Sequence, residues 1–251
     1  MKKIILPLVL LCYYTCFAQK NESYFIFDGK WNPVQDVKKA KFFIHSEKIN
    51  DTCWQLNYYN FLGPLIKTES FREEEAKTAN GFFAYYSKDG YLDSCGYVVN
   101  FKKDQYWTYF RGDSGKVYQR KIYDHGKLIK LEDYSQEQPD KEEEAKDWTF
   151  ANLKLESEFT GGSASWQTYL NKNLRYPQRA IDAESQGTVW ILFVVDKEGK
   201  VVEPVIAKSV EFSIDQESIR IIKKSPTWTP AFKEGKRVNS YKKQPIVFRL
   251  E

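Results

Sequence analysis

Residues 187–208 have the sequence GTVWILFVVDKEGKVVEPVIAK. Thr188–Val195 is an apolar run rich in β-branched residues, which predicts a strand that is covered on one face. The polar segment Asp196–Gly199 predicts a turn, and Lys200–Lys208 predicts the returning strand. This hairpin has an apolar face that other elements must cover, so it decides the fold class of the C-terminal part of the chain.

Helical patterns flank the hairpin on both sides. Ser163–Leu174 carries apolar residues at helical spacing and offers a serine as cap, and Tyr176-Pro177 ends it before a short helix over Gln178–Ala183. Ser213–Gln216 has the pattern of a capping box and predicts a second long helix. A last strand from about Asn239 to Leu250 completes an α+β domain over residues 151–251, with a three-stranded antiparallel sheet and helices on one face.

The N-terminal part, residues 20–131, predicts an all-β structure. Asp89-Gly90 separates two β-rich runs, which is a strong hairpin signal. The pattern returns after 24 residues, so that Phe83, Tyr85 and Tyr86 correspond to Trp107, Tyr109 and Phe110. These units resemble MORN-like hairpin repeats, which implies a scaffold or binding platform. A β-meander without a ligand is the alternative. Residues 132–150 join the two parts, and we interpret this acidic stretch as a linker.

The first 18 residues have the pattern of a secretory signal peptide. A basic start precedes an apolar run that is shorter than the ~20 residues of a membrane-spanning helix, and Ala18 offers a cleavage point. We therefore expect a periplasmic protein. An uncleaved segment that anchors the chain in the inner membrane, facing the periplasm, and a lipid anchor at Cys12 or Cys16 are the alternatives. Cys53 and Cys95 remain after cleavage, and the sequence leaves open whether they are bonded.

We find no constellation that predicts an enzyme. The chain has two histidines, His45 and His125, and neither is placed to form a catalytic set or a metal cluster with the cysteines. Asp113-Ser114-Gly115 predicts a turn in the hairpin repeat. Charges are scattered, with 16 Lys and Arg against 12 Asp and Glu from Ala151 to Glu251, so no nucleic-acid partner is expected. We expect no catalytic residue, no cofactor and no metal.

An ordered set of motifs over about ninety C-terminal residues resembles the C-terminal domain of TonB. The set consists of a Tyr-Pro with a basic-Ala pair, a Gly-x-Val before an apolar strand, an Asp and Gly turn, a Trp-x-Pro, a Gly-Lys and a closing strand with Phe near its end. These are Tyr176-Pro177-Gln178-Arg179-Ala180, Gly187-Thr188-Val189, Asp196 with Gly199, Trp228-Thr229-Pro230, Gly235-Lys236 and Pro245-Ile246-Val247-Phe248.

The resemblance implies a partner and a binding mode. Domains of this family pair their C-terminal edge strand with an extended peptide, the TonB box, of an outer-membrane receptor. The partner-binding residues that it implies here are Tyr176, Pro177, Lys242, Lys243, Gln244, Pro245, Ile246, Val247, Phe248, Arg249 and Leu250.

Three functions follow as hypotheses. The first is an envelope protein that binds a peptide or an outer-membrane receptor by strand addition. The second is an energy transducer for outer-membrane transport, which requires an uncleaved membrane anchor. The third is a structural protein that forms a homodimer.

Overall fold

The computed structural model describes residues 21–112, 115–135, 157–233 and 236–250. The predicted signal peptide, most of the predicted linker, and Asp113 and Ser114 of the predicted turn lie outside the described residues.

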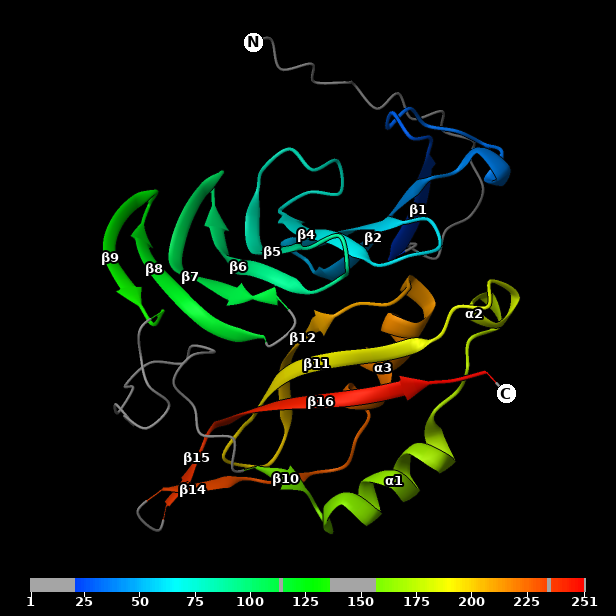
Figure 1. The fold of residues 1–251 in the computed structure, drawn as a ribbon. Coiled ribbons are helices and arrows are strands. Elements are labelled where there is room, and N and C mark those ends of the chain that lie inside the picture. Colours follow the sequence, from blue (N-terminus) through cyan, green and yellow to red (C-terminus); the bar gives the residue numbers. More distant parts are fainter. Residues whose placement is uncertain (1–20, 113–114, 136–156, 234–235, 251) are drawn as a thin grey trace.

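Nine strands in chain order form one antiparallel sheet in the N-terminal part (Figure 1). The predicted Asp89-Gly90 turn joins β5 to β6, which confirms this hairpin. The last strand extends through Glu132 and Asp133, two residues that the sequence suggested for the linker. The strands are β1 (Glu22–Phe27), β2 (Phe42–Asn50), β3 (Cys53–Asn60), β4 (Leu65–Phe71), β5 (Asn80–Tyr86), β6 (Leu92–Val99), β7 (Lys102–Arg111), β8 (Lys116–Asp124) and β9 (Lys127–Asp133), with a 3-10 helix at Val37–Lys39 between β1 and β2.

Equivalent residues of the 24-residue pattern lie in rows across this sheet. Gly96 pairs with Phe83 on one side and with Trp107 on the other. A Cβ atom at Gly96 would lie 2.6 Å from the Trp107 ring, so the glycine makes room for the indole of the neighbouring strand. This register is consistent with stacked hairpin units.

The C-terminal part has the predicted α+β order. The main sheet has the strand order β12-β11-β16, with α1 and α3 on one of its faces (Figure 1). Two small two-stranded ribbons, β10 with β13 and β14 with β15, complete it. The elements are β10 (Glu158–Phe159), α1 (Gly162–Asn173), α2 (Gln178–Asp182), β11 (Gly187–Val195), β12 (Val201–Lys208), α3 (Phe212–Lys223), β13 (Trp228–Thr229), β14 (Ala231–Lys233), β15 (Lys236–Val238) and β16 (Ser240–Phe248).

The predicted helix caps are wrong in both long helices. Helix α1 begins after Gly161, which has a φ of 89° and no capping side chain, and the serine at position 163 lies inside the first turn. Helix α3 is capped by Glu211, whose carboxylate accepts from the Ser213 amide at 2.8 Å. The acidic residue competes successfully for the free amides of the first turn because its charge favours the helix N-terminus.

Strand β11 is covered on both of its faces, so the expectation of one covered face is also wrong. Ile191 and Phe193 face the helices, and both are fully buried. On the other face, Leu192 lies with Val205 of β12 against Leu92, Cys95 and Phe110 of the nine-stranded sheet. The small sheet is therefore enclosed between its own helices and the N-terminal sheet (Figure 1).

Cys53 and Cys95 are free thiols in this fold. Cys95 is buried among apolar side chains, and this burial raises the pKa of its thiol to about 12. It therefore acts as a small core residue. No helix in the described part of the chain has the length and apolar character needed to cross a membrane.

Candidate functional site

The C-terminal strand β16 forms one edge of the three-stranded sheet. It pairs with β11 from Ser240 to Phe248 without a register shift. Within the described residues, no strand pairs with its other side. An edge strand of this kind presents backbone N–H and C=O groups that can pair with an added strand.

Side chains of β16 alternate between the core and the opposite face. Ile246 and Phe248 are buried against the helices, and Val247 between them is 45% exposed. The Lys243 ammonium lies 4.9 Å from the centre of the Trp190 ring, on the same face as Val247, and burial lowers its pKa. Two core anchors thus fix the strand and leave Val247 accessible.

Pro245 lies within the strand, opposite Trp190 of β11. Proline has no N–H, so in a sheet it suits an edge position where that group would point away from the neighbouring strand. Lys243 and Val247 are two residues away on either side and share its backbone orientation. This assigns the outward-facing amides of β16 to Lys243 and Val247.

The ends of the predicted site differ in their roles. The Lys242 ammonium donates to the Ser157 carbonyl at 2.9 Å and ties β16 to the start of the domain. The strand ends at Phe248 and is therefore shorter than expected, and Arg249 and Leu250 lie beyond its end. Gln244 pairs with Ile191 inside the ladder.

Tyr176 lies next to the end of β16. Its ring packs edge-on against Phe248 with ring centres 5.4 Å apart, and its hydroxyl donates to the Ser185 carbonyl at 2.7 Å. Pro177 precedes α2, and its carbonyl accepts from the Ala180 amide at 3.0 Å, as at a helix start. The fold thus brings the two predicted parts of the site together at the contact of Tyr176 with Phe248.

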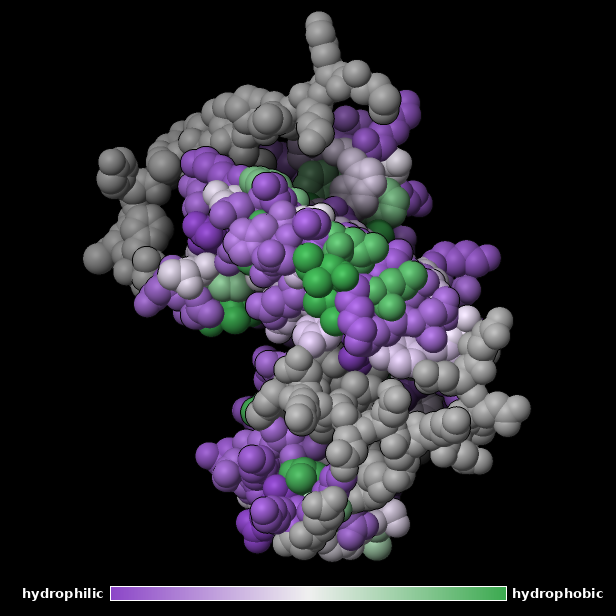
Figure 2. Space-filling view, turned by 90° about the vertical axis from the view of Figure 1, so that its left-hand side faces the viewer, coloured by the Kyte–Doolittle hydropathy of each residue, from purple (hydrophilic) through white to green (hydrophobic). Residues whose placement is uncertain are grey.

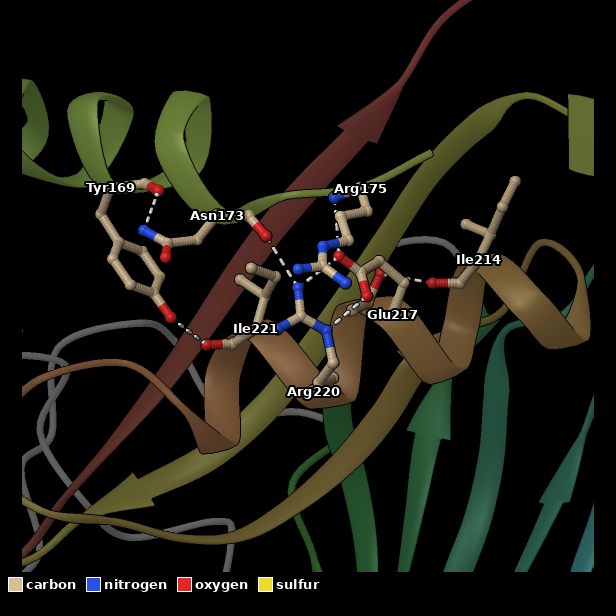
Figure 3. Close-up of polar contacts among 8 residues, drawn as sticks. Tyr169, Asn173, Arg175, Ile214, Glu217, Arg220 and Ile221 are labelled. Atoms are coloured by element: carbon tan, nitrogen blue, oxygen red, sulfur yellow. Dashed lines mark hydrogen bonds and ion pairs between the residues drawn. The ribbon is translucent and has the colours of Figure 1, made fainter. Parts of the chain in front are cut away.

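A polar clamp between α1 and α3 positions the segment that carries Tyr176 (Figure 3). The Glu217 carboxylate accepts from the Arg175 amide at 2.7 Å and from the Arg220 guanidinium at 2.6 Å. Arg220 also donates to the Asn173 carbonyl at 2.7 Å, and the Tyr169 hydroxyl donates to the Ile221 carbonyl at 2.9 Å. These contacts hold the end of α1 and the chain after it on α3.

Arg179, in the same motif as Tyr176, lies at a contact between the two domains. Its guanidinium pairs with the buried Glu211 carboxylate at 2.6 Å and donates to the Phe61 carbonyl of the N-terminal part. It also lies over the rings of Phe43 and Phe61, at 5.2 and 5.0 Å. Sequence reasoning did not find this role, because the partners are distant in the chain.

Asp215 of α3 is the centre of a second contact between the domains. Its buried carboxylate accepts from the Ser209 hydroxyl at 2.5 Å, from the Val210 amide at 3.0 Å and from the Tyr59 hydroxyl of β3 at 3.2 Å. Burial raises the pKa of Asp215 to about 7, although the three donors oppose the rise. From the sequence, Asp215 could be placed only in the first turn of a predicted helix, and its contact with Tyr59 could not be predicted.

The turn after β8 brings Asp104, Asp124 and His125 together, which the sequence did not predict. The His125 amide donates to Asp104 at 2.9 Å, and the imidazole Nδ1 lies 2.8 Å from Asp124. These hydrogen bonds stabilise the turn, and they explain why the three side chains lie close together.

The fold and the edge strand define the class of this domain: a small α+β module with helices on one side of an antiparallel sheet whose last strand is an edge. Residues 172–250 match the family model of the Gram-negative bacterial TonB protein C-terminal domain. This part of the chain therefore resembles a TonB C-terminal domain, and the match covers about a third of the chain. Comparison with curated proteins gave no match. Comparison with solved structures also gave no match.

Proposed function

We propose that this protein binds an extended peptide of an outer-membrane receptor, or of another envelope partner, by strand addition at β16. The observation that carries the proposal is that β16 pairs with β11 on one side only, within the described residues. A peptide that lies along β16 completes the ladder through backbone hydrogen bonds, and pockets for alternate side chains add specificity.

The two edges of the three-stranded sheet differ in a way that favours β16. At the other edge, Lys208 at the end of β12 forms a bridge with Tyr91 of the N-terminal sheet. The Ser209 amide donates to the Gly90 carbonyl at 2.9 Å beside it. One edge is thus engaged by the rest of the chain, which directs an incoming strand to β16.

Peptide titration with matched variants tests the proposal. A synthetic TonB-box peptide is added to the isotope-labelled protein, and the amide signals of β16 are followed by NMR. We expect shifts that concentrate on Lys242–Leu250. Val247→Pro removes an outward amide and should abolish binding, whereas Val247→Ala keeps the amide and should leave binding nearly unchanged. Binding that survives in the proline variant, or shifts confined to other strands, would contradict strand addition.

The domain family supports energy transduction as a second candidate. Transmission of force requires that the N-terminal segment stays attached to the inner membrane. Mass spectrometry of the native protein from soluble and membrane fractions distinguishes the two functions. A soluble species that starts at Gln19 favours a binding adaptor, and an intact Met1 in the inner-membrane fraction favours the transducer.

A further inference from the structure

Strand β9, at the end of the nine-stranded sheet, exposes an unusual amount of apolar surface. Leu128, Ile129 and Leu131 are 48%, 57% and 51% exposed. Figure 2 looks onto the side of the molecule where β9 lies in Figure 1 and shows an apolar patch there. Within the described residues, β9 pairs with β8 and has no strand on its other side. Exposed apolar side chains on an edge strand favour pairing with another strand, so these three residues indicate a surface for pairing.

Strand β9 combines apolar and charged side chains. Leu131 lies opposite Lys121, which lies opposite Trp107, so Leu131 and Trp107 belong to the same row of cross-strand neighbours. On the other face, Glu132 pairs with Lys130 at 2.8 Å and with the buried Arg120 at 3.2 Å. The strand therefore presents exposed apolar side chains beside side chains of both charge signs.

We propose that β9 pairs with β9 of a second copy of this chain, antiparallel, with Leu131 on the two-fold axis. This register places Leu131 opposite Leu131 of the second copy. It also places Lys130 opposite Glu132 of the second copy, twice by symmetry. An isologous contact needs a patch that complements itself, and this strand meets that condition in both its apolar and its charged positions.

A neighbouring register is less favourable. A shift that moves the axis to Lys130 places the two Lys130 side chains directly opposite each other, and like charges in that arrangement destabilise a strand pair. The charges of β9 therefore select the axis at Leu131. The contact is independent of peptide binding because β16 belongs to the other domain.

Sedimentation of the full chain over a range of concentrations tests the dimer. We expect a reversible dimer. Leu131→Lys, which changes an exposed side chain and places like charges on the axis, should weaken dimerisation about tenfold. Tyr24→Lys is the matched control, since Tyr24 is 52% exposed on β1 at the opposite edge of the same sheet. It should leave dimerisation unchanged.

Cysteine cross-linking tests the register. Under mild oxidation, Leu131→Cys should link two chains, and Lys130→Cys should link them much less. The parent chain, with Cys53 and Cys95 alone, supplies the background. A monomer at every concentration, an equal loss of the dimer in Tyr24→Lys, or cross-linking through Lys130→Cys in place of Leu131→Cys would overturn the proposal.

Discussion

The hydroxyl of Tyr59 donates a hydrogen bond at 3.2 Å to the carboxylate of Asp215, which lies 156 residues later in the chain. Tyr59 belongs to β3 of the N-terminal sheet, and Asp215 belongs to the first turn of α3 in the TonB-like domain. Both side chains are buried. This contact joins the two domains through a polar group that cannot reach water.

Tyr59→Phe should lower the free energy of unfolding by about 1.5–3 kcal/mol, because it removes one donor from a buried carboxylate. Denaturant unfolding followed by tryptophan fluorescence measures the change. Tyr85→Phe is the control, since Tyr85 is 37% exposed on the outer face of the same sheet. Equal effects of the two substitutions would show that the hydroxyl of Tyr59 has no special role.

Stability should fall as pH rises from about 4 to about 7. Burial raises the pKa of Asp215 from 3.8 to about 7, so in this window the folded state holds a proton that the unfolded state releases. The contribution has a slope of at most about 1.4 kcal/mol per pH unit and levels off above pH ~7. Unfolding curves at several pH values should show that Asp215→Asn removes this part of the slope. An unchanged slope in that variant would contradict the assignment.

Arg179→Ala should lower the free energy of unfolding by about 2 kcal/mol. The substitution leaves Glu211 with its charge buried and its partner lost, although access of water to the half-exposed Arg179 reduces the cost. Arg175→Ala is the control because the Arg175 side chain is exposed and the contact of this residue with Glu217 is made by its backbone amide. Thermal unfolding of the two variants measures the difference. Equally small losses of stability in both would contradict a role for the Arg179–Glu211 ion pair.

Gly90→Ala should destabilise the protein more than Gly126→Ala. Both glycines have positive φ, 80° and 93°, so both substitutions carry backbone strain. At Gly90 the added Cβ would also lie 2.5 Å from the Ser209 carbonyl oxygen, whereas at Gly126 its nearest neighbour is the Lys102 side chain at 3.3 Å. The difference in free energy of unfolding between the two variants measures how tightly the domains approach. Equal losses of stability in the two variants would mean that backbone strain alone, and not the contact with Ser209, determines the effect.

Local signals in the sequence were sufficient for much of this fold. The Asp89-Gly90 turn and the helix predicted to start at Ser213 depend on neighbours in the chain, and the structure has both elements. The cap at Glu211 was missed because neighbouring polar residues compete for the same amides within one turn, whereas α1 begins after Gly161 without a capping side chain.

Contacts between the domains could not be predicted from these signals. The partners of Arg179 and Asp215 in the N-terminal part are more than a hundred residues away, and no periodicity in the sequence marks them. The same packing explains why Leu192 is buried although one apolar face was expected for its strand. The edge position of β16 was expected from the resemblance to TonB, and the structure places this strand at the edge of the sheet beside β11.

Hydrogen exchange at the amides of Lys243 and Val247 tests strand addition at β16 most directly. These amides share the backbone orientation of Pro245 and face away from β11. Addition of a TonB-box peptide should slow their exchange and leave the amides of Gln244 and Ile246, which face β11, nearly unchanged. Exchange at Lys243 and Val247 that stays the same when the peptide is bound would contradict the proposed binding mode.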